Sequence, residues 1–238
     1  MVSGTETFRA LHHGRLPGDP LVLPGPWDAA SARVFADAGF PALATPSAGV
    51  AASLGYADGE TPADEMFAAV ARIVRAVDVP VSADVEDGYG LAPKELVERL
   101  LETGAVGCNL EDSRGGVLKD PREHTDLLAR VRAEAGDALF INARVDTFAR
   151  GVADPERAIE RAASYVAAGA DCVYPIGAPA DLLPLLRAGI QGPLNVYARA
   201  DGPSPRQLGE LGATRVTFGP GLQRRAMAAL GEIAAQLE

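Results

Sequence analysis

From residue 21 to its end, the chain alternates between short apolar segments and longer segments with a helical pattern, and the alternation repeats eight times. Short apolar runs bounded by Gly, Pro or Asp are typical of buried strands, and the longer segments have the apolar spacing of amphipathic helices. The predicted strands are residues 21–24, 42–45, 79–85, 106–110, 139–145, 171–174, 194–197 and 215–218. The predicted helices that follow them are residues 28–38, 62–77, 93–103, 121–135, 155–168, 180–188, 205–211 and 221–237. Residues 1–20 are expected to hold a leading helix, and residues 46–60 a long polar loop.

Glycine marks the ends of several predicted helices in the same way. The repeated phrases are Ala38-Gly39-Phe40, Thr103-Gly104-Ala105, Ala168-Gly169-Ala170 and Leu211-Gly212-Ala213. Glycine fits the residue after a helix, where φ is positive. Eight such strand–helix units predict an α/β fold, the (β/α)8 or TIM barrel, as a single domain over residues 1–238. A doubly wound open sheet would need a glycine fingerprint after the first strand, and Pro24-Gly25-Pro26-Trp27 is not one.

The third predicted strand ends in a cluster of acids, Asp84-Val85-Glu86-Asp87. Alternation places Asp84 and Glu86 on one face of a strand and Asp87 on the other. Two neighbouring carboxylates repel each other unless a cation or a proton offsets the repulsion. The pattern therefore predicts a hard divalent metal held by oxygen ligands.

Polar residues also follow the other predicted strands. Active sites of TIM barrels lie at the carboxyl ends of the strands, so these residues are expected to surround one site. They are Trp27 and Asp28, the run Ser47-Ala48-Gly49 with Asp58 further along its loop, Asn109 to Asp112, Arg144 and Asp146, and Asn195.

Charge and composition exclude some functions. The net charge is −10 with no basic cluster, which argues against nucleic acid as a partner, although a local arginine or metal still allows an anionic substrate. No apolar run is long enough to span a membrane, and residues 1–8 lack the apolar core of a signal peptide. Cys108 and Cys172 lie in strand-like runs and are expected to be buried free thiols. We therefore expect a cytoplasmic protein without a membrane partner.

Five phrases of this chain resemble the isocitrate lyase/phosphoenolpyruvate mutase superfamily, over nearly the whole length from about Phe8. They are Pro24-Gly25-Pro26-Trp27-Asp28-Ala29-Ala30-Ser31-Ala32, Ser47-Ala48-Gly49-Val50-Ala51 with Leu54-Gly55-Tyr56-Ala57-Asp58-Gly59, Ala83-Asp84-Val85-Glu86-Asp87-Gly88-Tyr89-Gly90, Asn109-Leu110-Glu111-Asp112, and Ala143-Arg144-Val145-Asp146. Together they are specific, and they suggest a member similar to phosphoenolpyruvate phosphonomutase.

The resemblance implies a Mg²⁺ ion at the mouth of the barrel that holds a 2-oxo acid or its enolate. By position, Asp84 resembles the direct metal ligand, and Glu86 and Glu111 resemble ligands that act through water. Asp58 matches a further acid near the metal. Arg144 resembles the cation that stabilises the enolate oxygen, so Arg144, Asp58 and Glu111 are the catalytic candidates.

The resemblance also implies a set of substrate contacts. The backbone N–H groups of Ser47, Ala48 and Gly49 would bind the substrate carboxylate, and Arg144 would also contact the substrate. Asn195 matches a polar substrate contact of the lyase branch. Trp27 is a further candidate for contact with the substrate, with packing in the core as the alternative.

One loop departs from every branch of the family. Lyases that cleave isocitrate or methylisocitrate carry a Lys-Lys/Arg-Cys-Gly-His loop after the fourth strand and a glutamate after the sixth, where this chain has Ile176. The phosphonate enzymes carry Lys-Thr-Asn in that loop. Residues 113–120 read Ser-Arg-Gly-Gly-Val-Leu-Lys-Asp and contain none of these motifs. Gly115-Gly116 is a candidate hinge.

Together these features predict a Mg²⁺-dependent enzyme that acts on a small 2-oxo carboxylate through an enolate. The expected reaction is carbon–carbon cleavage, either an oxaloacetate-type decarboxylation or a retro-aldol release of pyruvate. The alternatives are a phosphonomutase or phosphonopyruvate hydrolase, and an idle barrel that binds a dicarboxylate. The resemblance further implies a homo-oligomer, a dimer of dimers, with the last helix exchanged about Gly219-Pro220-Gly221. His12 and His124 are expected at the surface.

Overall fold

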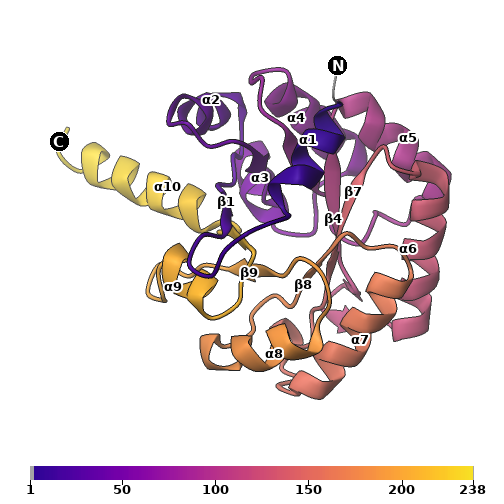
Figure 1. Ribbon diagram of the computed structural model, residues 1–238. Helices are drawn as coiled ribbons and strands as arrows, with labels where there is room; N and C mark the ends of the chain where they lie inside the picture. The colour runs from indigo at the N-terminus through magenta and orange to yellow at the C-terminus, as the bar shows by residue number, and fades with distance from the viewer. Residues whose placement is uncertain (1–2, 238) are drawn as a thin grey trace.

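A computed structural model describes residues 3–237 and shows parallel strands in a ring, with helices around it (Figure 1). The barrel strands are β1 (Leu21–Leu23), β2 (Leu43–Ala44), β3 (Val81–Asp84), β4 (Gly107–Leu110), β7 (Phe140–Arg144), β8 (Cys172–Tyr174), β9 (Asn195–Tyr197) and β10 (Arg215–Thr217). They form two parallel sheets, β2-β3-β4-β7-β8 and β1-β10-β9. Backbone hydrogen bonds close both junctions: the N–H of Ala44 donates to Pro24 O (3.2 Å), and that of Val173 donates to Pro193 O (3.1 Å). The barrel prediction is confirmed.

Helices follow the strands as the pattern predicts. They are α1 (Gly4–Leu11), α2 (Ala29–Asp37), α3 (Ser47–Leu54), α4 (Ala63–Val74), α5 (Pro93–Thr103), α6 (Pro121–Ala135), α7 (Pro155–Ala167), α8 (Leu183–Gly189), α9 (Pro205–Glu210) and α10 (Gly221–Ala234), with short 3-10 turns η1 (Phe148–Arg150) and η2 (Ala180–Leu182). Gly39, Gly104, Gly169 and Gly212 have φ of 89°, 81°, 100° and 113°, so glycine ends the preceding helix as predicted.

The prediction of a polar loop over residues 46–60 is wrong for its first half, where the chain forms α3. This helix starts after Pro46 and ends at Gly55, whose φ is 88°. Its small residues give a weak amphipathic pattern, which is why periodicity does not reveal it. The consequence for the site is that a helix N-terminus, rather than a loop, follows β2.

The atypical loop after β4 is a tight hairpin of β5 (Ser113–Arg114) and β6 (Val117–Leu118). Gly115 and Gly116 form its two-residue turn with φ of 54° and 83°. Positive φ at both positions is the geometry of a hairpin turn that favours glycine. The glycine pair therefore closes a compact hairpin.

Helix α1 covers the amino-terminal ends of the strands, where Thr5 Oγ1 donates to Ala138 O (2.9 Å). Phe8 is fully buried and packs edge-to-face on Phe140, with ring centroids 5.2 Å apart. His12 stacks on the same Phe140 ring at 4.1 Å and is only 2% exposed. Because α1 plugs this end of the barrel, the surface placement expected for His12 is wrong.

His124 is also buried, on α6, with its ring 4.8 Å from that of Tyr165 on α7. The expectation of a surface position is wrong here too, because the first turn of α6 faces α7. Cys108 and Cys172 are buried free thiols, as predicted. Within residues 3–237, no helix is both long enough and apolar enough to cross a membrane.

Candidate active site

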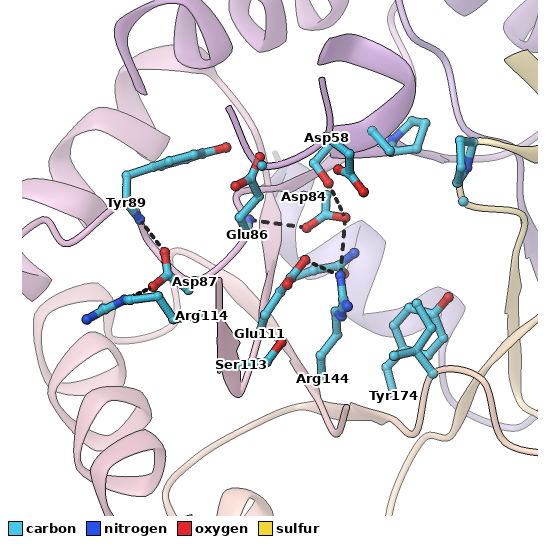
Figure 2. A pocket seen from close by; sticks show the side chains of 18 of the residues that line it. Asp58, Asp84, Glu86, Asp87, Tyr89, Glu111, Ser113, Arg114, Arg144 and Tyr174 are labelled. Carbon is cyan, nitrogen blue, oxygen red and sulfur yellow. Dashed lines mark hydrogen bonds and ion pairs between the residues drawn. The ribbon is translucent and has the colours of Figure 1, made fainter. Parts of the chain in front are cut away.

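A cavity of about 880 Å³ opens at the carboxyl ends of the strands, the end predicted for the active site. Eight of the residues predicted to surround the site line it: Ser47, Ala48, Asp58, Asp84, Glu86, Asn109, Glu111 and Arg144. Figure 2 shows the carboxylates of Asp84 and Glu111 near Arg144, with Asp58 close to Asp84 and the Glu86 carboxylate turned toward the hydroxyl end of Tyr89. The structure therefore brings the predicted metal and catalytic candidates together.

Asp84, the last residue of β3, is 8% exposed and lies beside the start of α3. Its Oδ2 accepts a hydrogen bond from Ser47 Oγ (3.2 Å), and its Oδ1 accepts one from the Glu86 N–H (3.3 Å). Its own N–H donates to Thr45 Oγ1 (3.1 Å). Burial raises the pKa of Asp84, while Arg144 and these hydrogen bonds oppose the shift.

Glu86 reaches the cavity by a route that strand alternation did not anticipate. β3 ends at Asp84, and Glu86 has a φ of 52°, a value that is uncommon for a residue with a side chain. Burial, and next the charges of Asp84 and Asp58, raise the pKa of Glu86 to about 7. Glu86 Oε1 is buried without a hydrogen-bond partner in the described part of the chain. Such an oxygen is suited to a cation or to water held by one.

Asp87 lines the same cavity, but its carboxylate is turned toward the hairpin (Figure 2). Strand alternation does not account for this direction, because β3 ends at Asp84. Asp87 accepts hydrogen bonds from Arg114 of the hairpin and from the Tyr89 N–H (3.0 Å), and Lys119 Nζ lies 3.6 Å from its Oδ2. Burial opposes the shift, but Arg114 and Lys119 hold the pKa of Asp87 below its usual value. Asp87 thus links the end of β3 to the hairpin.

Arg144, at the end of β7, is surrounded by carboxylates. It donates to Glu111 Oε1, its Nε lies 3.0 Å from Asp146 Oδ1, and its Nη1 lies 4.0 Å from Asp84 Oδ2. Although burial opposes it, Glu111, Asp146 and Asp84 raise the pKa of Arg144. Burial raises the pKa of Glu111, Arg144 opposes this shift, and Asp84 adds to it. A positive guanidinium is therefore held between the acids.

The donor set fits one Mg²⁺ ion bound largely through water. In residues 3–237, no three acidic, His or Cys side chains are grouped closely enough to ligate one ion directly. Mg²⁺ usually keeps several waters and takes one or two carboxylates. Asp84 as direct ligand, with Glu86 and Glu111 acting through water, matches that preference and would offset the repulsion among the acids. The metal roles predicted for these residues are compatible with the geometry.

The first turn of α3 supports the predicted carboxylate cradle. Ser47 and Ala48 line the cavity, and the helix begins at Pro46 without a side-chain cap. The first N–H groups of a helix lack partners within the helix and attract anions. Gly49 lies behind this turn: a Cβ on Gly49 would come within 2.9 Å of the Pro46 ring. Gly49 therefore allows the close approach of Pro46 and does not line the cavity.

Trp27 and Asn195 also lie outside the cavity lining. Trp27 packs edge-to-face on Phe35 with ring centroids 6.4 Å apart. Asn195, at the start of β9, is fully buried inside the barrel and accepts a hydrogen bond from Thr217 Oγ1 (3.2 Å). Thr217 lines the cavity, so Asn195 lies one layer below it. The substrate contacts predicted for Trp27 and Asn195 stay predictions.

Sequence reasoning missed Tyr89, Ser113, Arg114 and Arg150, which also line or border the cavity. The predicted site residues lie mostly within the first few positions after each strand. Arg150 lies six positions beyond Arg144, on η1, and the hairpin brings Ser113 and Arg114 back over the mouth. The signal for Arg114 and Arg150 is an arginine further along the loop after the fourth and the fifth predicted strand.

The comparison with known families agrees with this site. Residues 8–238 match the family model described as phosphoenolpyruvate phosphomutase. The chain belongs to this family, within the isocitrate lyase/phosphoenolpyruvate mutase superfamily. The superfamily predicted from the five sequence phrases is confirmed.

Similar proteins cover nearly the full chain. An uncharacterized protein of Mycobacterium tuberculosis (strain ATCC 25618 / H37Rv) is 36% identical over 90% of this chain and 81% of its own length. A protein of Corynebacterium glutamicum named “probable 2-methylisocitrate lyase 2” is 34% identical over 98% of this chain and 82% of its own length. The crystal structure of a “putative phosphonomutase” from Burkholderia cenocepacia J2315 has a TM-score of 0.90 and 40% identity, and covers 98% and 99% of the two chains. Two of these three relatives thus carry names of the lyase and mutase types.

Proposed function

We propose that this protein is a Mg²⁺-dependent carbon–carbon lyase that acts on a small 2-oxo carboxylate through an enolate. One observation carries the proposal: Arg144, the buried carboxylate of Asp84 and the half-buried carboxylates of Glu86 and Glu111 line one cavity at the carboxyl ends of the barrel strands. The reaction is a decarboxylation of an oxaloacetate-like acid or a retro-aldol cleavage that releases pyruvate.

In the proposed reaction, different residues of the chain bind the substrate, stabilise the developing charge and position Arg144. Mg²⁺, when bound, supplies a Lewis acid for the carbonyl and carboxylate oxygens of the substrate. The first turn of α3 binds the substrate carboxylate. Arg144 donates hydrogen bonds to the oxygen on which negative charge grows as the carbon–carbon bond breaks. A preorganised donor of this kind lowers a barrier by roughly 3 kcal/mol. Glu111 and Asp146 hold Arg144 in place before the substrate arrives.

The loop after β4 does not decide between carbon–carbon and phosphorus–carbon cleavage. Its hairpin lacks the Lys-Thr-Asn motif of the phosphonate enzymes and also the cysteine motif of the isocitrate and methylisocitrate lyases. Carbon–carbon cleavage is favoured by the similarity to the protein named “probable 2-methylisocitrate lyase 2”. The second candidate, a phosphonomutase or phosphonopyruvate hydrolase, rests on the similarity to the “putative phosphonomutase”. An idle barrel that binds a dicarboxylate is the third.

A product assay separates these candidates. Purified protein with Mg²⁺ is incubated with a panel of 2-oxo diacids and with phosphonopyruvate, and pyruvate, CO₂, phosphate and phosphoenolpyruvate are measured. The proposal predicts pyruvate from a 2-oxo diacid faster than in the metal-containing blank. Phosphate or phosphoenolpyruvate from phosphonopyruvate would favour the second candidate. Binding of oxalate without consumption of any acid would favour the third.

We also propose that the protein forms a homo-oligomer through α10. Figure 1 shows this helix extending away from the barrel. Met227, Leu230 and Ile233 on it are 45%, 55% and 55% exposed. An apolar face of this kind is buried in soluble proteins by another surface, and a second copy of the chain supplies one with matching symmetry. A dimer of dimers with exchanged C-terminal helices is the arrangement proposed.

A further inference from the structure

Besides Arg144 and Arg114, the cavity has a third arginine, Arg150, in its wall. Arg150 ends η1, six residues after Arg144 on the same segment. Its Nε and Nη2 both donate to Ser113 Oγ, at 3.2 and 3.0 Å, so the side chain is held against the hairpin. About a third of the side chain is exposed. Arg150 is therefore an anchored cation that still faces solvent and the cavity.

A single buried carboxylate sets the positions of Arg144 and Arg150. Asp146 has no exposed surface, and its backbone N–H donates to Asp112 Oδ1 (2.7 Å). Its Oδ2 accepts from Arg144 Nη2 (3.1 Å) and from Ser113 Oγ, the same hydroxyl that Arg150 contacts. Arg150 Nη2 lies 3.9 Å from Oδ2. Asp146 thus fixes the spacing between Arg144 and Arg150.

The charge of Arg150 is only partly balanced. Asp146 is already hydrogen-bonded to Arg144 and to Ser113, and its 3.9 Å contact with Arg150 is too long for a hydrogen bond. Within residues 3–237, Arg150 Nη1 donates to no acceptor. This nitrogen lies 3.9 Å from where a Cβ on Gly116 would be, so the glycine turn leaves room beside it. Arg114 differs, because Asp87 pairs with it directly.

We propose that Arg150 binds a second anionic group of the substrate, remote from the 2-oxo carboxylate, and that Asp146 sets its distance from Arg144. The inference rests on the proposed function, since it assumes that Arg144 contacts the reacting end. It makes the substrate a dianion whose far end carries a carboxylate or a phosphonate. Arg150 is then a specificity-determining residue, and Asp146 is a positioning residue.

Calorimetric titrations with Mg²⁺ present test this with ligands of two lengths. Oxalate reaches only the inner end of the site, whereas 3,3-difluorooxaloacetate and phosphonopyruvate each carry a remote anion. Charged hydrogen bonds of this kind account for about a tenfold or greater change in affinity. Arg150→Gln is expected to weaken the longer ligands at least about tenfold and oxalate less than about twofold. If Arg150→Gln weakens 3,3-difluorooxaloacetate more than phosphonopyruvate, the remote group of the substrate is a carboxylate. If it weakens phosphonopyruvate more, the remote group is a phosphonate.

Two further variants make the test specific. Arg150→Lys keeps the charge without the planar fork and is expected to lose less affinity for the longer ligands than Arg150→Gln. Arg114→Gln removes an equal charge from the same rim, but one that Asp87 already balances, and is expected to change the affinity for the longer ligands by less than about twofold. Unchanged oxalate affinity shows that each variant is folded.

Several results would overturn the inference. Equal weakening of oxalate and of the longer ligands by Arg150→Gln would mean that Arg150 acts only through Asp146 and Arg144. No change for either ligand class would mean that Arg150 contacts neither. Failure of the wild-type protein to bind oxalate with Mg²⁺ is a different result, because it removes the proposed function itself. If the wild-type protein binds oxalate with Mg²⁺ but Arg150→Gln does not change the affinity for the longer ligands, only the inference about Arg150 is removed.

Discussion

Glu86 is the residue at which the site differs most from an ordinary protein surface. Its φ of 52° places a side chain in the left-handed region, which costs of order 1–3 kcal/mol. Its Oε1 has no partner within the described residues, and burial raises its pKa to about 7. Each of these features is unfavourable in the metal-free chain. A bound cation would offset the cost of the unpartnered Oε1 and of the raised pKa.

The raised pKa of Glu86 predicts how stability depends on pH. The folded metal-free chain keeps this proton up to about pH 7, whereas the unfolded chain loses it near 4.5. The folded state thus binds more protons in this interval, so the contribution of Glu86 to stability is full below pH 4.5 and is lost as pH rises toward 7. Mg²⁺ displaces the proton, so the rise in Tm that Mg²⁺ causes should be larger at pH 7.5 than at pH 5.5.

Thermal melts from pH 5 to 8, with and without Mg²⁺, measure this effect. Glu86→Gln is the matched control because it keeps the shape and cannot titrate. It is expected to flatten the pH dependence of the Tm shift. A Tm shift in the wild-type protein that is the same at pH 5.5 and 7.5 would contradict the prediction.

At the scale of elements, the sequence predicts those parts of the site that follow directly from strand order. Asp84, Glu111 and Arg144 each end a strand, or come directly after one, and neighbouring parallel strands carry their ends to one rim. Their convergence could be predicted because it needs only the barrel. Arg150 and Ser113 depend on η1 and on the hairpin turn, which have no periodic signal. The burial of His12 and His124 depends on how α1 and α6 dock, which the local sequence does not encode.

Asp112 joins three elements and predicts a large effect on stability. It is fully buried and accepts hydrogen bonds from Arg161 Nη1 (2.9 Å), from the Tyr165 hydroxyl (2.7 Å) and from the Asp146 N–H (2.7 Å). Asp112→Ala would leave the buried Arg161 without its carboxylate. The free energy of unfolding should fall by about 3 kcal/mol or more.

Urea denaturation of the wild-type protein and of Asp112→Ala measures this loss of stability. Asp126→Ala, at an exposed position on α6, is the control and should change the free energy of unfolding by less than about 0.5 kcal/mol. A loss below about 1 kcal/mol for Asp112→Ala would show that the buried pair contributes little.

For the whole molecule, the two ends of the barrel differ, and α10 is a long helix that is largely exposed. α1 closes the amino-terminal end, while the carboxyl end keeps the cavity open. In α10, only Gln223 is buried, whereas Leu230 and Ile233 are more than half exposed. The spacing of the sequence predicts this helix, but which surface covers it depends on assembly and cannot be inferred from one chain.

The proposed assembly predicts that Leu230→Glu separates the subunits. A charge placed in a buried apolar contact is strongly unfavourable, so the variant should have a mass near the 24.6 kDa of one chain by light scattering. Gln236→Glu adds the same charge at a polar position just after α10 and should keep the mass of the wild-type assembly. A wild-type protein that is itself monomeric would remove the proposal.

The binding of oxalate, a planar analogue of an enolate, tests the whole account most directly. Calorimetry compares the wild-type protein with Asp84→Ala, each with Mg²⁺ and with chelator. Wild-type protein is expected to bind about one oxalate per chain only when Mg²⁺ is present. Asp84→Ala is expected to bind none, because the buried carboxylate at the end of β3 holds the metal. Equal oxalate binding without Mg²⁺, or full binding by Asp84→Ala, would contradict this expectation.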